Sequence, residues 1–321
     1  MKVLANRVSG TDGCVLALSV IVEVIKTSNL RNRYKYPFYG TDINTSTNQG
    51  GEWVKEDLNK QVARQILKDA KKDKLKYFIN LEKTVKKEAS EFKKYSRHIL
   101  KTLSTSLSDQ ELINLYNSFI LKYIYYYGPG ALSFLYESII SDWLYASLSK
   151  KYHDNTTQVI SQLLESSYQS FMIASEILLH QINKSSDIKR KNLVKEYLGK
   201  FFFINTNYLD APVLNETQIL EKAKTLKAHK DNFKAIKIKF KLSEDEKIMA
   251  RLLKLSTPIR DQRKYINLIG GYLIFRFLDQ ALKKHKINRE LAKRMFWFEF
   301  KDLIFNTEKL LTRLKKDSLS P

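Results

Sequence analysis

Turn-forming residues are scarce in this chain. Its 321 residues include only 10 Gly and 5 Pro, which disfavours folds built from many tight turns or several glycine-rich loops. Helix-start signals recur instead. Ser108 and Ser243 are each followed three residues later by a glutamate, which is the spacing of a capping box. The sequence therefore predicts an all-α protein, a multi-helix bundle of about ten helices.

Residues 1–52 differ from the rest and are expected to form a short irregular or β-containing lead-in to a helical domain at residues 53–321. The lead-in holds the longest apolar run, Cys14 to Val22, which is too short to span a bilayer. Asp12 and Glu23 flank this run, and no clear cleavage site follows it, so a signal peptide is disfavoured. We expect a protein without a membrane span, with the run buried as a strand or a helix.

Breaker residues and apolar periodicity divide the remaining chain into helices. A helix from residue 109 is expected to end at the Gly128-Pro129-Gly130 sequence, and the helix from Ser243 is expected to end before Pro258. Further helices are predicted at residues 157–183, near 193–198, from Pro258 to about 286, and after Asn288. Residues 200–214 are expected to be extended and rich in turns.

The helix that begins at Pro258 carries an arginine among apolar residues. At 100° per residue, one stripe contains Ile259, Arg263, Ile266, Gly270, Leu273, Ile274, Phe277 and Ala281, flanked by Arg260 and Lys264. A buried guanidinium needs an anionic partner, because an unpaired buried charge is very costly. Arg263 is therefore either a structural cation, with Glu299 or Asp302 as its partner, or a ligand for a bound anion together with Arg260 and Lys264.

Positive charge dominates the sequence, with 56 Lys and Arg against 34 Asp and Glu, a formal net charge of +22. Such a balance suits nucleic acid, nucleotides or anionic lipids, although a lysine-rich composition alone also produces it. Residues 55–101 are basic. The densest run is residues 222–241, with one acid and eight lysines: Lys222, Lys224, Lys227, Lys230, Lys234, Lys237, Lys239 and Lys241. These lysines are either a polyanion surface or the solvated side of a helix end or strand.

Four tyrosines, Tyr123, Tyr125, Tyr126 and Tyr127, precede the Gly-Pro-Gly sequence. Aromatic side chains on a basic protein can stack on nucleic-acid bases. Aromatics on both faces of a helix just before a turn are more typical of a core or an interface. The sequence leaves both interpretations open, with the core favoured.

Motifs for common chemistries are missing from the sequence. It has no GxxxxGK[ST] or GxGxxG loop for phosphate, no HExxH pair for zinc and no GxSxG nucleophile turn. Its single cysteine, Cys14, excludes an intramolecular disulfide and suits a reducing compartment, so a cytoplasmic location is expected. No metal and no cofactor are expected.

The C-terminal third nevertheless resembles a known family. Residues 197–214, a lysine-rich stretch and residues 257–304 follow in the order found in the helical region of PEP-utilising enzymes, which include phosphoenolpyruvate synthase-like phosphotransferases. The matching features are the cationic helix start with Arg263, the RELAKRM helix and a closing helix with Glu299. The resemblance covers about residues 53–305 and is most specific in residues 195–305.

The resemblance implies a helical module rather than a complete enzyme. Family members that transfer phosphate use a glycine-rich ATP-grasp domain and a histidine in a small swivelling domain, and neither has a counterpart in these 321 residues. The implied function is a non-catalytic scaffold, or one subunit of a split phosphotransferase whose partners carry the ATP-grasp and phosphohistidine domains. The alternative from charge alone is a basic helical protein that binds nucleic acid or another polyanion.

Overall fold

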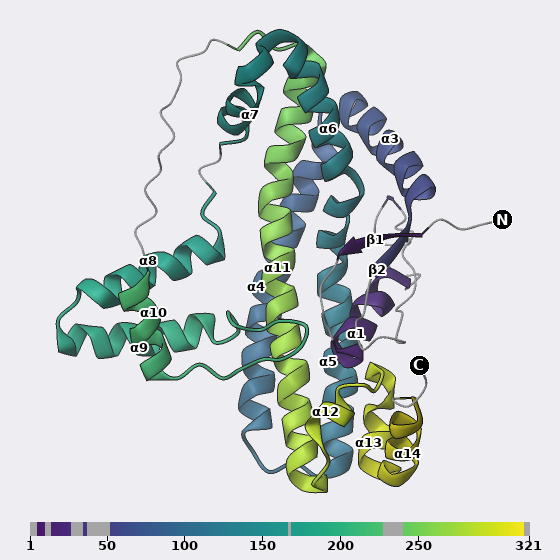
Figure 1. The fold of residues 1–321 in the computed structure, drawn as a ribbon, viewed down its shortest axis with the longest axis vertical. Helices are drawn as coiled ribbons and strands as arrows, with labels where there is room; N and C mark the ends of the chain where they lie inside the picture. The colour runs from purple at the N-terminus through teal and green to yellow at the C-terminus, as the bar shows by residue number, and fades with distance from the viewer. Residues whose placement is uncertain are drawn as a thin grey trace.

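The computed structural model describes residues 5–9, 14–26, 35–36, 52–165, 168–226 and 240–317. Helices dominate these residues (Figure 1), which confirms the all-α, multi-helix prediction. Their bounds are α1 Val15–Lys26, α3 Glu56–Lys72, α4 Lys76–Leu103, α5 Asp109–Ala131, α6 Ser133–Tyr152, α7 Thr156–Leu164, α8 Phe171–Lys184, α9 Asp187–Phe201, α10 Glu216–Thr225, α11 Glu244–His285, α12 Arg289–Ala292, α13 Phe300–Phe305 and α14 Thr307–Asp317.

The described part of residues 1–52 joins the same core as the helices that follow. Strand β1 (Ala5–Ser9) pairs antiparallel with β2 (Glu52–Lys55), so that Arg7 lies opposite Trp53. The apolar run forms α1, and its Leu16 and Val20 are fully buried. The N–H of Cys14 donates to the carbonyl of Tyr208 (2.8 Å), which ties the start of α1 to a distant segment.

Helix α11 is the central element, with 42 residues and a length of about 63 Å. Helix α4 runs beside it in the same direction (Figure 1). Lys71, at the end of α3 and close to the start of α4, forms an ion pair with Asp245 near the start of α11. At the other end, Gln280 of α11 donates to the carbonyl of Leu103, the last residue of α4 (2.6 Å). The two helices are thus in register over nearly the whole length of α4.

Helices α5 and α6 follow one another along α11 in the opposite direction. The Lys284 ammonium near the end of α11 lies 2.9 Å from the Asp109 carboxylate at the start of α5. Near the start of α11, Glu246 receives a hydrogen bond from Ser147 of α6 (2.7 Å). Only Leu132 separates α5 from α6, so together they act as one long antiparallel partner for α11.

The contact face of α11 follows an alternating three- and four-residue spacing, which keeps one line of side chains on one side of a helix. This line, here called the seam, contains Met249, Leu252, Ser256, Ile259, Arg263, Ile266, Gly270, Leu273 and Phe277; all of them except Arg263 are buried. All the buried residues of α4 except Ala89 are likewise three or four positions apart: Phe78, Leu81, Val85, Glu88, Phe92, Ser96, Ile99 and Leu103. Each seam therefore contains one charged residue.

Both proline-based helix ends predicted from the sequence are wrong, because Pro258 lies inside α11 and Pro129 lies inside α5. A proline within a helix deprives the carbonyl four residues earlier of its partner. Those carbonyls belong to Lys254 and Tyr125, which are exposed residues, so water can bond them. Packing against neighbouring helices then keeps each helix continuous.

Other helix limits were placed with mixed success. The capping boxes at Ser108 and Ser243 are confirmed, as is the cap at Asn288. The single helix predicted at residues 157–183 is wrong, because α7 ends at Leu164 and Ser170 caps the separate helix α8. Helix α9 is longer than the predicted residues 193–198.

Two glycines allow helices α5 and α11 to approach closely. A methyl group added to Gly130 of α5 would lie 2.3 Å from Cβ of Arg263, and one added to Gly270 of α11 would lie 2.3 Å from the ring of Tyr123. Neither position has room for a side chain. These contacts fix the spacing of the two helices at two levels of the bundle.

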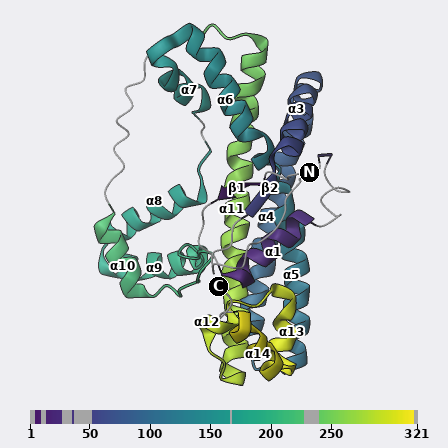
Figure 2. The same cartoon turned by 45° about the vertical axis from the view of Figure 1, so that its right-hand side comes forward.

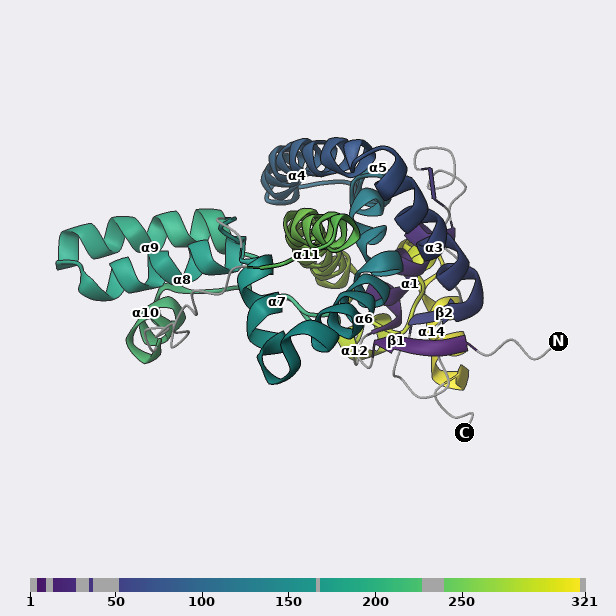
Figure 3. The same cartoon turned by 90° about the horizontal axis from the view of Figure 1, so that it is seen from above.

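Helices α8, α9 and α10 form an arm that projects from the bundle (Figures 1 and 3). Aromatic contacts join the base of the arm to α11. Tyr265 lies with its ring centroid 5.4 Å from that of Phe171 and 5.0 Å from that of Phe203. Helices α12 to α14 pack at the lower end of the bundle, beside α1 and α5 (Figure 2).

Close packing at Gly270 leads to a first prediction. Gly270→Ala is expected to lower the free energy of unfolding by about 2 kcal/mol, because the added methyl group collides with a buried ring. Gly199→Ala in α9 is the matched control: a methyl group there meets nothing within 4 Å. It should raise stability by up to about 1 kcal/mol, since alanine has the higher helix propensity. Urea unfolding measures both, and equal effects would contradict the packing argument.

The start of α11 leads to a second prediction. Burial raises the pKa of Glu246, but hydrogen bonds from Lys151, Ser147 and Ser243 outweigh it and lower the pKa to about 2. This carboxylate therefore contributes stability that is fully present above pH 4.5 and is lost as the pH falls toward 2. Glu246→Gln is expected to lose about 3 kcal/mol at pH 7 and to flatten the acid limb.

Glu244→Gln serves as the control for that measurement. Glu244 belongs to the same first turn, but its side chain is 80% exposed and its ion pair is with Lys247. Unfolding free energies measured from pH 7 to pH 2 should differ from wild type by less than about 0.5 kcal/mol in this variant. An unchanged acid limb in Glu246→Gln would show that the interactions of Glu246 are not stabilising.

Candidate functional site

Arg263 lies at the centre of the bundle, where α5, α6 and α11 meet. Its Cβ packs against Gly130, and its Nε and Nη1 atoms are inaccessible to solvent. Glu137 of α6 is a carboxylate that interacts electrostatically with Arg263. Burial raises the pKa of Glu137, while Arg260 and Arg263 lower it. The partly buried Arg263 thus has a carboxylate close enough to interact with, which suits a structural cation.

The predicted partners of Arg263 are wrong. Glu299 accepts hydrogen bonds from the Arg313 guanidinium (2.5 and 2.6 Å). Asp302 instead accepts from the side-chain amide of Asn306 (2.9 Å). Sequence reasoning chose acids from the following helices, but the antiparallel α6 brings Glu137 to α11. The missed signal is an acid inside the apolar sequence FLYESII.

The side chains of Arg260, Arg263 and Lys264 do not together line one enclosed site for an anion. The Arg260 side chain is 55% exposed and its Nη1 lies 3.3 Å from Oε2 of Glu137. Lys264 is exposed, whereas Arg263 is partly buried against α5. Two of the three cations thus face solvent, and Arg260 and Arg263 both act electrostatically on the same glutamate.

Three of the eight lysines predicted as a polyanion surface lie within the described residues, and they are not equivalent. The Lys222 ammonium donates to the side-chain oxygen of Asn205, and burial lowers its pKa. Lys224 and Lys241 are exposed. The other five, Lys227, Lys230, Lys234, Lys237 and Lys239, lie outside the described residues.

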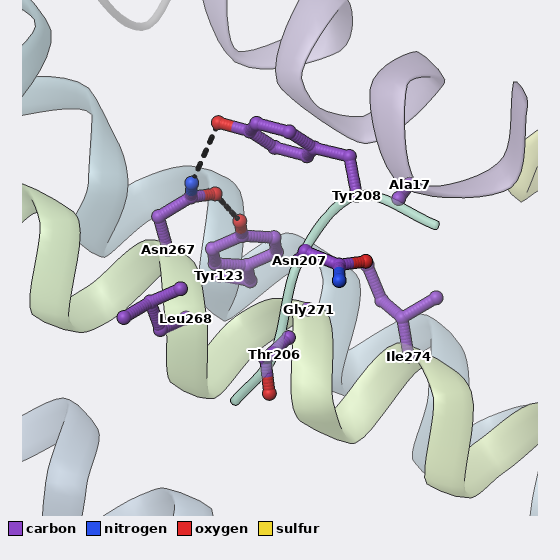
Figure 4. A pocket seen from close by; sticks show the side chains of 9 residues that line it. All are labelled: Ala17, Tyr123, Thr206, Asn207, Tyr208, Asn267, Leu268, Gly271 and Ile274. Carbon is purple, nitrogen blue, oxygen red and sulfur yellow. Dashed lines mark hydrogen bonds between the residues drawn. The ribbon is translucent and has the colours of Figure 1, made fainter. Parts of the chain in front are cut away.

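A small pocket with several polar side chains in its wall lies where the segment after α9 crosses α11 (Figure 4). The Tyr123 hydroxyl donates to Oδ1 of Asn267 (2.7 Å), and Nδ2 of Asn267 donates to the Tyr208 hydroxyl (2.8 Å). The buried hydroxyl of Thr206 also borders the pocket and has no hydrogen-bond partner among the residues that the structure describes. With a volume of about 40 Å³ and uncharged walls, the pocket suits water or a very small neutral molecule.

The exposed side of α4 carries a straight row of cations. Lys76, Lys83, Lys87, Lys94 and Lys101, here called the lysine row, are all exposed. At 100° per residue they lie within about 40° of one another and span about 38 Å. They project opposite the buried seam of α4. Glu82 and Glu91 lie beside the row and interact with Lys86 and Lys87, so acids offset only part of its charge.

Exposed apolar side chains of α5 border the lysine row. Tyr126 reaches Glu91 of α4, and Lys122 of α5 lies over the ring of Tyr95, so the two helices are adjacent here. On the outer surface of α5, Leu121 is 67% exposed and Tyr125 is 48% exposed. Tyr123 and Tyr127 are buried. The core interpretation therefore holds for those two tyrosines, while Tyr125 lies about half exposed on the outer surface.

The described residues offer little for redox or metal chemistry. Burial raises the pKa of Cys14 to about 11, which keeps it a thiol at neutral pH. Among the residues that the structure describes, no three His, Cys, Asp or Glu side chains gather as metal ligands. Over the same part of the chain, none of the helices combines the length and the apolar character needed to cross a bilayer.

The electrostatic role of Arg263 leads to a third prediction. Arg263→Met is expected to lower the free energy of unfolding by about 3 kcal/mol, because it leaves Glu137 buried with less compensation. Adding Glu137→Gln should recover part of that loss, which a double-mutant cycle measures by urea unfolding. Arg251→Met, at an exposed position of the same helix, is the control and should cost less than about 1 kcal/mol. Additive losses would contradict a coupled pair.

No known protein family, curated protein or solved structure matches this chain. The resemblance to the helical region of PEP-utilising enzymes therefore stays a prediction.

Proposed function

We propose that this protein binds single-stranded nucleic acid along the lysine row of α4 and the neighbouring exposed surface of α5. The observation that carries the proposal is the row itself, with five exposed lysines on one line of a single helix. On the exposed side of α4, acidic residues are fewer than lysines. The net charge of +22 adds a long-range attraction for polyanions.

Charge along the row suits a nucleic-acid backbone. The lysines repeat at intervals of four and seven residues, or about 6 and 10 Å along the helix axis. Long lysine side chains can adjust to successive phosphates over these distances. Binding of this kind releases counterions from the nucleic acid and depends steeply on salt concentration.

Tyr125 gives the surface a second means of contact. Its ring is 48% exposed and forms an edge contact with Tyr126, with 5.2 Å between ring centroids. Stacking on an aromatic ring requires an unpaired base, which favours a single strand over a duplex. The bundle behind α4 also opposes duplex recognition, because α4 together with α5 and α11 is broader than a major groove of about 12 Å.

The test is fluorescence anisotropy with labelled single-stranded RNA and DNA of about 20 nucleotides, from low to physiological salt. Replacing Lys83, Lys87, Lys94 and Lys101 together with Gln is expected to weaken binding at least about tenfold. It should also reduce the slope of log affinity against log salt by about 3. Tyr125→Ala should weaken single-strand binding about tenfold further.

Matched variants separate this site from general charge. Replacing the exposed Lys150, Lys254, Lys301 and Lys309 with Gln changes the net charge equally and should leave most of the affinity. Tyr145→Ala removes a tyrosine that is 51% exposed on α6 and should have little effect. Equal losses in the two lysine sets would show diffuse electrostatic attraction and overturn the proposal.

A further inference from the structure

The outer surface of the arm exposes isoleucines that its own packing does not use. Ile173 and Ile177 of α8 are 48% and 42% exposed, and Ile188 at the start of α9 is 82% exposed. The arm is packed by other residues, including Leu178, Leu179 and Ile182, which are buried. The exposed isoleucines therefore form a separate surface.

These side chains have the spacing of a helix-binding surface. Ile173 and Ile177 are one turn apart, and His180, Gln181 and Lys184 continue the same side of α8. The end of α8 and the start of α9 form an open groove of about 600 Å³, lined by Ile177, His180, Gln181, Lys184, Ser185 and Lys189. A groove with an apolar stripe suits the apolar face of an amphipathic helix.

The charge around the groove indicates the charge of the partner that it can bind. Lys184 and Lys189 line it, with His180 between them and the isoleucines. The acids nearby are Glu176 and Asp187, and Asp187 forms an ion pair with Arg190 (2.9 Å). The groove lining itself is cationic, so a partner with acidic residues beside its apolar face gains both contacts.

We propose that the arm binds an acidic amphipathic helix of a partner protein. A second copy of this chain is a poor occupant, because each copy carries a net charge of +22 and the groove itself is cationic. The proposal is independent of nucleic-acid binding, since the groove is formed by α8 and α9 whereas the lysine row belongs to α4.

The probe for this proposal is a labelled 18-residue peptide of Leu and Glu arranged as an amphipathic helix. Two further peptides accompany it: one with Lys in place of Glu, and one with the same Leu and Glu composition in scrambled order. Anisotropy is expected to show binding of the acidic amphipathic peptide at least about tenfold tighter than either. Equal binding of the scrambled peptide would overturn a helix-shaped site.

Substitutions then locate the site. Ile173→Ser with Ile177→Ser should weaken binding at least about tenfold, whereas Val213→Ser with Phe305→Ser, at positions 56% and 49% exposed, should not. Lys184→Glu with Lys189→Glu should reverse the preference toward the lysine peptide. All these residues are exposed, so the melting temperature is expected to stay unchanged.

Two outcomes would assign the surface to another occupant. A doubled mass in light scattering that Ile173→Ser with Ile177→Ser returns to a monomer would identify a second copy as the occupant. Displacement of the acidic peptide by a single-stranded oligonucleotide in the variant that lacks four lysines of the row would identify the arm as a polyanion site. Either result overturns the proposal.

Discussion

The close approach of α5 to α11 is the constraint on which the rest of the bundle depends. Gly130 lies against Arg263, and Gly270 lies against Tyr123. At both levels of the bundle, the lack of a side chain on the glycine lets the two helices approach closely. Tyr123 then reaches Asn267, and Asn267 reaches Tyr208 in the segment after α9. The spacing of two helices therefore also positions the segment that joins α9 to α10, and with it the small pocket.

Features that depend on local chemistry, such as helix starts, could be predicted from the sequence. Capping boxes at Ser108 and Ser243 marked true helix starts, because the side chain and the backbone amides that it satisfies lie within one turn. Pro129 and Pro258 misled the same reasoning, since tertiary packing and hydration allow each to remain inside a helix. Local sequence signals therefore indicate where a helix tends to start or end, and tertiary packing determines whether it does so.

Features that depend on tertiary contacts were only partly predictable. The abnormal position of Arg263 was visible as a charge in an apolar stripe. Glu137, whose pKa Arg263 lowers, lies 126 positions away and reaches α11 through the reversal of the chain into α6. Among the lysines, spacing alone could have found the row on α4, because Lys76, Lys83, Lys87, Lys94 and Lys101 repeat in phase. Burial was needed to show that Lys222 points inward while Tyr125 points outward.

The parallel pairing of α4 with α11 has a consequence for synthesis of the protein. The contact between Leu103 and Gln280 joins residues 177 positions apart. The other buried residues of α4 also pack against residues of α11 that are similarly distant in the sequence. Such non-local pairing forms slowly, because closing the intervening loop costs conformational entropy before any stabilising contact forms. On the ribosome, α4 and α5 are therefore made long before the helix that covers them, and their apolar seams depend on temporary protection until α11 emerges.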